Sequence, residues 1–210
     1  MRHLKALFAA FVLINLVLLA LAPTVHADLN DFTVTSFKAD YTLTKADPQG
    51  QLNVSEAINV DFTDQNHGIL RAIPDSYKGH SLELKVDSIT STSGAPTEYS
   101  TYQSGGNTVL KIGDPTRTVT GAQEYTINYT LNNVISFYQD HDELYWDING
   151  NQWTQAFENV TATLHLPRGL QLNSQAPVCY AGATGSTTQG SCVGSAGWVT
   201  FHGRQACSVA

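Results

Sequence analysis

Alternation with period two constrains this chain more than any other feature. It is clearest from Gln51 to Phe62, where every second residue is apolar apart from one carboxylate. The apolar residues of this segment are Leu52, Val54, Ile58, Val60 and Phe62. Successive side chains of a β-strand point to opposite faces, so the pattern predicts a strand with one buried and one wet face.

The same alternation recurs along the chain, and no window has the periodicity of an amphipathic helix. Asp47-Pro48-Gln49-Gly50 is a turn sequence and predicts a hairpin. A change of parity after Val34 predicts a β-bulge near Ser36. Further strands are expected in 37–43, 82–86, 109–112, 125–131, 144–148, 160–166 and 198–201.

These segments predict about eight or nine short strands separated by turns, and therefore an all-β fold. We expect an antiparallel β-sandwich with an immunoglobulin-like, two-sheet architecture, and an open barrel is the alternative. Charged residues make up 14% of the chain and hydrophobic residues 42%. This composition argues against disorder, and the net charge of −7 leaves no general basic surface for nucleic acid.

The first 27 residues have the features of a signal peptide. Arg2 and Lys5 precede an apolar run from Ala6 to Ala22, and small or aliphatic residues lead up to a cleavage point after Ala27. An uncleaved membrane anchor is the alternative, because the run is at the short end of the spanning range. We therefore expect an exported protein, extracellular or on the outer face of the membrane, with a β-sandwich domain over residues 28–170.

Three cysteines follow in residues 171–210, where we expect a disulfide-closed loop and a last strand. Cys179 and Cys192 flank a stretch of Gly, Ser and Thr, and an oxidising compartment would favour a disulfide between them. A pair formed by Cys192 and Cys207 is the alternative. The cysteines lack Cys-x-x-Cys spacing, so we expect no metal, and no cofactor motif is present.

One carboxylate interrupts the buried face of the Gln51–Phe62 strand. Glu56 has the parity of the apolar residues, and a buried carboxylate without a partner is costly. Arg71 is the nearest plausible cation in the sequence, so we predict a structural ion pair between Glu56 and Arg71. The alternatives are a functional carboxylate in a cleft, or a strand end at which Glu56 reaches water.

A few residues are candidates for binding. Asp140-His141-Asp142-Glu143 is the densest acidic cluster, and we interpret it foremost as a solvated turn. A calcium site and a carboxylate-dependent hydrolase centred on Glu143 are remote alternatives. Tyr138 and Tyr145 lie off the core parity and are the better surface candidates for a sugar-binding platform, and with Trp153 and Glu143 they form the set of binding candidates.

Several motifs occur in an order that resembles the N-terminal domain of the predicted membrane proteins called domain of unknown function 2207. Their order and spacing, over roughly Phe32 to Pro167, carry the resemblance. The motifs are Val54-Ser55-Glu56-Ala57-Ile58, His67-Gly68-Ile69-Leu70-Arg71-Ala72-Ile73-Pro74, Lys111-Ile112-Gly113-Asp114, Gly121 to Tyr129, Asp142 to Gly150 with Trp153, and Leu164-His165-Leu166-Pro167.

The resemblance implies an exported β-sandwich followed by transmembrane helices, with no established activity. This sequence stops at Ala210 without such a helix, so we expect a truncated membrane protein or a secreted variant. We predict a non-enzymatic interaction module of the cell envelope, and a carbohydrate-binding module is the alternative. The expected partner is an unknown cell-envelope protein or a glycan, with membrane contact only through a retained signal anchor or a missing C-terminal transmembrane region.

Overall fold

The computed structural model describes residues 31–170 and, beyond them, residues 172, 177–182, 186, 188–195, 197–203 and 207–209. Within these residues the protein is all-β and has no helix, as the alternation predicts. The described part therefore offers no helix that is long and apolar enough to cross a membrane. The predicted signal peptide, residues 1–27, lies outside the described residues.

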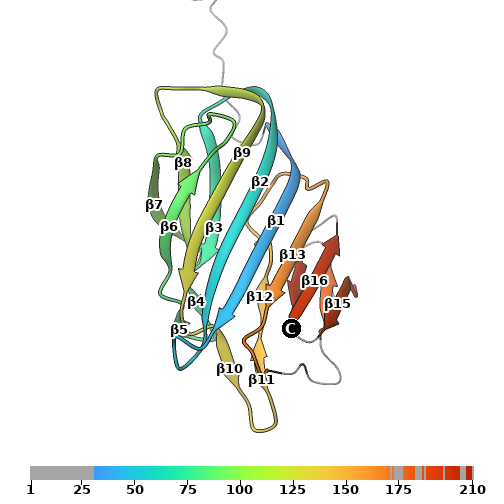
Figure 1. Cartoon of the computed structure of the whole chain (residues 1–210). Helices are drawn as coiled ribbons and strands as arrows, with labels where there is room; N and C mark the ends of the chain where they lie inside the picture. The colour runs from blue at the N-terminus through green and yellow to red at the C-terminus, as the bar shows by residue number, and fades with distance from the viewer. Residues whose placement is uncertain are drawn as a thin grey trace, which may run out of the picture.

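A seven-stranded sheet, here called the large sheet, forms the front of the molecule in Figure 1. Its longest strands come from the segments with the strictest alternation, which bury one face and expose the other. In spatial order its strands are β15 (Ser191–Ser195), β16 (Trp198–Gly203), β13 (Val160–His165), β1 (Phe32–Thr44), β2 (Gln51–Asn66), β9 (Val119–Leu131) and β6 (Lys85–Thr90).

The predicted hairpin and bulge are both confirmed in β1 and β2. The turn is closed by the Gly50 N–H, which donates to the Asp47 carbonyl at 3.0 Å, while Asp47 Oδ1 accepts from the Gln49 N–H at 2.8 Å. The register of β1 against β2 shifts between Val34 and Ser36. The bulge restores the parity of the buried face on both of its sides.

The prediction of a purely antiparallel sheet is wrong at one pair. β1 and β13 run parallel, from Phe37 opposite Val160 to Thr42 opposite His165. The preceding segment already follows β1, because the Val34 N–H donates to the Ala156 carbonyl at 3.0 Å. Alternation is the same in both orientations, so it cannot reveal strand direction. The narrower immunoglobulin-like assignment stays a prediction.

A three-stranded sheet, here called the small sheet, lies behind the left part of the large sheet in Figure 1. Its strands are β3 (Gly68–Pro74), β8 (Asn107–Gly113) and β7 (Tyr99–Ser104). The remaining strands form three further sheets: β12 (Trp146–Asp147) with β17 (Cys207–Val209) and β14 (Cys179–Ala181), β4 (Ser76–Tyr77) with β5 (His80–Ser81), and β10 (Ile135–Phe137) with β11 (Asp142–Leu144).

One core joins the large and small sheets. Its buried members include Phe37, Ile58 and Ile127 from the large sheet and Ile73 and Leu110 from the small sheet. Side chains of both sheets therefore pack against one another in one core. The core also shows why β2 and β9 alternate so strictly, since each buries one full row of side chains in it.

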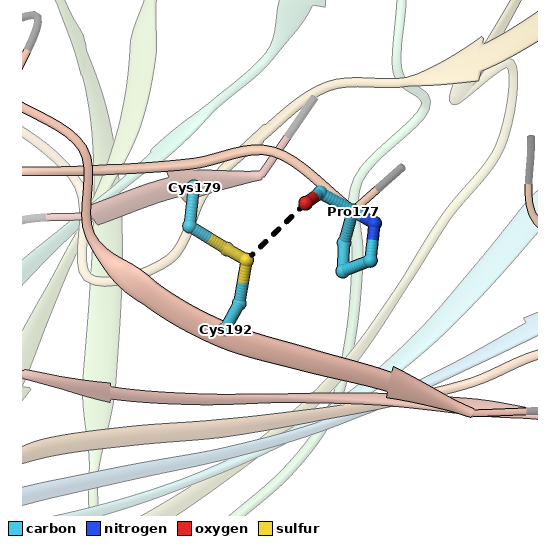
Figure 2. Close-up of a disulfide and its surroundings, with 3 residues drawn as sticks. All are labelled: Pro177, Cys179 and Cys192. Atoms are coloured by element: carbon cyan, nitrogen blue, oxygen red, sulfur yellow. Dashed lines mark hydrogen bonds between the residues drawn. A yellow bond between two sulfur atoms is a disulfide. The ribbon is translucent and has the colours of Figure 1, made fainter. Parts of the chain in front are cut away.

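The predicted disulfide between Cys179 and Cys192 is confirmed. It connects β14 to β15, with 6.0 Å between the two Cα atoms, and Figure 2 shows it beside Pro177. Cys192 Sγ lies 3.6 Å from the Pro177 carbonyl oxygen. The bond excludes the alternative pair of Cys192 with Cys207. Cys207 is in β17, where its backbone pairs with Ala181 of β14. The side chain of Cys207 lies outside the described part.

Candidate functional site

Glu56 and Arg71, which parity predicted to pair, meet in the core between the large and small sheets. Arg71 Nε donates to Glu56 Oε2 at 2.7 Å, and Arg71 Nη2 donates to Glu56 Oε1 at 2.6 Å. Both residues are 0% exposed. This two-bond geometry is the strongest that a guanidinium and a carboxylate form. The pair links β2 of the large sheet to β3 of the small sheet.

The remaining polar atoms of the pair are also hydrogen-bonded. The Tyr129 hydroxyl donates to Glu56 Oε1 at 2.7 Å. Arg71 Nη1 donates to the carbonyls of Ala72, at 2.6 Å, and Asn149, at 3.2 Å. Buried charges are tolerated when their hydrogen-bonding capacity is satisfied in this way. We call Glu56, Arg71, Tyr129 and Asn149 the buried network.

Burial and charge set the protonation states in this network. Burial alone would lower the pKa of Arg71, but Glu56 attracts the guanidinium and hydrogen-bonds to it, so the pKa lies above its ordinary value. Burial, with a further contribution from the Glu56 charge, raises the pKa of Tyr129 well above its usual value. The arginine is therefore charged and the tyrosine neutral at any physiological pH. All four residues of the network are at most 1% exposed, so the network is closed off from solvent.

Trp153 belongs to the surroundings of this network and lies apart from the other binding candidates. Its Nε1 donates to the Asn149 carbonyl at 2.7 Å, the same oxygen that accepts from Arg71. The indole ring is half-buried and meets the Phe157 ring edge-on, at 5.4 Å between centroids. An indole held in this way supports the core and is poorly placed to stack on a ligand.

The other three binding candidates come together on the surface. They are carried by β10, β11 and the residues around them, which meet the β4–β5 turn at the lower end of the molecule in Figure 1. Lys78 is central, in a turn where its φ of 47° is rare for a residue with a side chain. We call this group the Lys78 cluster: Tyr77, Lys78, Tyr138, His141, Glu143 and Tyr145.

Lys78, in the turn between β4 and β5, contacts side chains on and beside β10 and β11. Its Nζ lies 3.2 Å from Glu143 Oε1 and also hydrogen-bonds to the Tyr138 hydroxyl. The ammonium is 4.9 Å from the centroid of the Tyr138 ring and 5.1 Å from that of Tyr77, distances typical of cation–π contacts. The hydrogen bond with Tyr138, followed by that with Glu143, raises the pKa of Lys78.

Stacked rings complete the Lys78 cluster. Tyr77 and Tyr145 lie nearly parallel, with centroids 5.9 Å apart, and Tyr138 lies nearly parallel to His141 at 4.8 Å. Tyr138 is 46% exposed and Tyr145 is 36% exposed, so both rings also reach solvent. The sequence pattern missed Tyr77 and Lys78, although an aromatic residue and a cation before Gly79 were an available signal.

Two carboxylates of the acidic cluster 140–143 are engaged by neighbouring side chains. Glu143 is engaged by Lys78, and Asp140 Oδ1 lies 2.9 Å from His141 Nδ1. Within the described ranges, no group of three or more His, Cys, Asp and Glu side chains is placed to hold a metal ion. An apolar cavity of about 20 Å³ between Tyr41 and Trp146 has room for about one water molecule.

Comparisons with solved structures indicate the fold alone. Two structures of yeast LTA4 hydrolase, one in complex with bestatin and one native, are 9% and 8% identical to this chain, with TM-scores of 0.50 and 0.51. Each match covers 90% of this chain but only 31% of the yeast protein. An M1 zinc metallopeptidase from Deinococcus radiodurans is 11% identical over 86% of this chain and 42% of that chain, with a TM-score of 0.43.

The family comparison is more specific. No curated protein matches the sequence. Residues 33–203 match the family described as predicted membrane protein (DUF2207), N-terminal domain. This range contains the large sheet except Phe32, together with the small sheet, the buried network and the Lys78 cluster. Because the match covers most of the chain, the protein belongs to this uncharacterised family of predicted membrane proteins.

Proposed function

We propose that this chain is an extracytoplasmic interaction module of a cell-envelope protein and that it binds a partner protein through the Lys78 cluster. Family membership supports a place at the membrane, and the disulfide supports an oxidising compartment outside the cytoplasm. The observation that carries the proposal is the exposed group of tyrosines around Lys78 at one end of the sandwich.

The Lys78 cluster has the chemistry of an interface hot spot. Tyrosine is enriched at such sites because its ring is large and rigid while its hydroxyl is polar. Contacts with Tyr138 and Glu143 already hold Lys78, so little side-chain freedom remains to be lost on binding. Phe137, which is 58% exposed, adds apolar surface directly beside Tyr138.

A carbohydrate ligand is the second candidate, favoured by the exposure of Tyr138 and Tyr145. A sugar would stack on an open aromatic face. In this structure Tyr77 and Tyr145 stack on each other, and Tyr138 stacks on His141. These contacts occupy ring faces that a sugar platform would present, so the cluster suits a protein partner better. We propose no catalytic role for it.

Site-specific photo-crosslinking in the cells that produce the protein tests this proposal. A benzophenone amino acid at Phe137 should give a discrete protein adduct that disappears when Lys78→Ala is added. The same probe at Tyr102, which is 47% exposed on β7, is the matched control and should not give that adduct. The same adduct at both positions, or none at Phe137, would contradict the proposal.

A glycan array with the purified chain separates the two candidates. Under the proposal, no glycan binds in a way that depends on Tyr145. Binding that is lost in Tyr145→Ala and kept in Tyr102→Ala would replace the protein partner with a carbohydrate.

A further inference from the structure

The small sheet ends in an open edge. β7 pairs with β8 on one side, and none of the described strands pairs with its other side. All six residues of β7 are exposed, and the strand lies at the left margin of Figure 1. Such an edge presents unpaired backbone N–H and C=O groups that can take up another strand.

The hydrogen-bonding pattern shows which residues face outward. The Gly113 N–H donates to the Glu98 carbonyl at 2.8 Å, so Glu98 faces β8. Residues of an antiparallel ladder alternate between facing the neighbouring strand and facing away from it. The backbone groups of Tyr99, Thr101 and Gln103 therefore point away from β8, toward the open side.

The two edges on this side of the sandwich differ in their protection. β6, at the edge of the large sheet, carries Lys85 and Asp87 and has a register shift between Val86 and Ser88. Charges and bulges of this kind block pairing with another chain. β7 reads Tyr-Ser-Thr-Tyr-Gln-Ser, without charge or proline, and its register against β8 is continuous. Of these two edges, β7 is the regular and uncharged one.

We infer that β7 pairs with β7 of a second copy of this chain, antiparallel and about a two-fold axis at Thr101. In this register Thr101 lies opposite the partner's Thr101, and Tyr99 lies opposite the partner's Gln103. The outward groups of both strands then exchange their backbone hydrogen bonds in closely spaced pairs. The two small sheets become one continuous sheet.

The absence of charge on β7 favours a second copy as the occupant, because the strand meets its own copy without like charges facing each other. The chain carries a net charge of −7, so most surfaces of two copies repel each other. Glu98, the residue before β7, lies opposite the partner's Ser104 in this register, so the two copies of Glu98 do not face each other. The Asp75 carboxylate accepts a hydrogen bond from the Gln103 side-chain amide at 2.6 Å, within its own copy. The central pair of threonines is a favourable cross-strand combination.

Analytical ultracentrifugation of the purified protein over a concentration series tests the pairing. We expect a reversible monomer–dimer equilibrium. Thr101→Pro removes one outward N–H, keeps the bonds of its neighbours to β8, and should raise the dissociation constant roughly tenfold or more. Thr101→Lys should do the same by placing like charges on the axis, whereas Thr90→Lys on β6 is the matched control and should leave the dimer intact.

Cysteine cross-linking tests the register. In a Cys207→Ser background, Thr101→Cys should form a disulfide-linked dimer, because directly opposite residues lie within disulfide range. Gln103→Cys should not, since this register separates the two copies of residue 103 by about 13 Å. Thermal denaturation of each variant verifies that it is folded.

Two results would overturn the inference. One is a protein that stays monomeric up to about 1 mM, because a dissociation constant above that concentration is too weak for a specific contact. The other is a dimer that folded Thr101→Pro and Thr101→Lys variants leave unchanged. A β7 edge that takes up a strand of a different protein would appear as the monomeric outcome.

Discussion

At the scale of single residues, two tyrosines of β9 allow the contribution of a buried hydrogen bond to stability to be measured apart from that of packing. Tyr129 and Tyr125 are both buried, at 1% and 0% exposed. The Tyr129 hydroxyl donates to Glu56, while the Tyr125 hydroxyl has no hydrogen-bond partner among the described residues. Tyr129→Phe should therefore lower the free energy of unfolding by about 1.5–3 kcal/mol, the range for a bond to a charged group.

Tyr125→Phe is the matched control, because it removes a buried hydroxyl that makes no bond. Urea denaturation should show a change within about 0.5 kcal/mol, or a small gain. Equal losses in the two variants would mean that the Tyr129–Glu56 bond contributes nothing specific.

Arg71 permits a second test of the buried network. Arg71→Met leaves the Glu56 carboxylate buried without its cation, and should lower the free energy of unfolding by about 3–5 kcal/mol. Adding Glu56→Gln removes the stranded charge, so the double variant should be more stable than Arg71→Met alone. Urea denaturation of all three proteins measures this, and a loss under about 1 kcal/mol for Arg71→Met would refute the assigned role.

Residue parity was informative where a side chain departs from the pattern of its strand. It identified Glu56 because a carboxylate on an apolar face needs a partner, and it placed Tyr138 and Tyr145 off the core. It missed Lys78, because a turn residue acquires its neighbours only when β4–β5 meets β10–β11. It also grouped Trp153 with the surface tyrosines, since parity cannot show that an indole donates to the Asn149 carbonyl.

At the scale of elements, a pair of glycines permits the backbones of β3 and β8 to lie close together at one end of the strand pair. Gly68 and Gly113 are opposite each other and both have a φ of 134°. A Cβ on Gly68 would lie 1.9 Å from the Ile112 carbonyl oxygen, which is backbone and cannot turn away. Gly68→Ala should lower the free energy of unfolding by about 3 kcal/mol or more, from backbone strain and the clash together.

Gly121→Ala in β9 is the matched control for this contact. Gly121 also has a positive φ, 66°, but a Cβ there would meet no heavy atom within 4 Å. It should cost about 1–2 kcal/mol from backbone strain alone. Urea denaturation of both variants measures the difference, and equal losses would show that the close approach at Gly68 has no energetic weight.

Element by element, the sequence predicts strands well and their partners poorly. Alternation and turn residues located β1, β2 and the bulge between them, because both depend on neighbours in the sequence. Several strands were not expected, among them β3, which carries the buried Arg71, and β7, whose six residues are all exposed. The parallel pairing of β1 with β13 depends on the route of the intervening chain, which no local pattern encodes.

At the scale of the whole molecule, one polar network holds together parts that are distant in sequence. Glu56 and Tyr129 belong to the large sheet, Arg71 belongs to the small sheet, and Asn149 lies in the loop after β12. Because the network is buried, its protonation is coupled to folding as a whole. The pH dependence of stability therefore reports on the packing of the large sheet against the small sheet.

The buried tyrosines Tyr41, Tyr125 and Tyr129 predict a loss of stability in alkaline solution. Burial raises the pKa of Tyr125 to about 12, and burial followed by the Glu56 charge raises the pKa of Tyr41 and Tyr129 well above the ordinary value. In the unfolded chain these hydroxyls lose their protons near pH 10, while the folded protein still holds them. The unfolded state then binds fewer protons, so stability present below about pH 10 is lost as the pH rises through the folded pKa values.

Urea denaturation between pH 8 and 11 in a Cys207→Ser background, which avoids thiol exchange, measures this loss. Each buried tyrosine contributes a slope of at most about 1.4 kcal/mol per pH unit above pH 10. Tyr125→Phe should reduce the total slope by one such contribution, while its stability at pH 8 stays within about 0.5 kcal/mol of the parent protein, so the two curves diverge in alkali. Lysines titrate in the same range in both proteins and cancel in the difference. Parallel curves for the two proteins up to pH 11 would show that Tyr125 ionises in the folded state as readily as in the unfolded chain, and that the core around it is open to water.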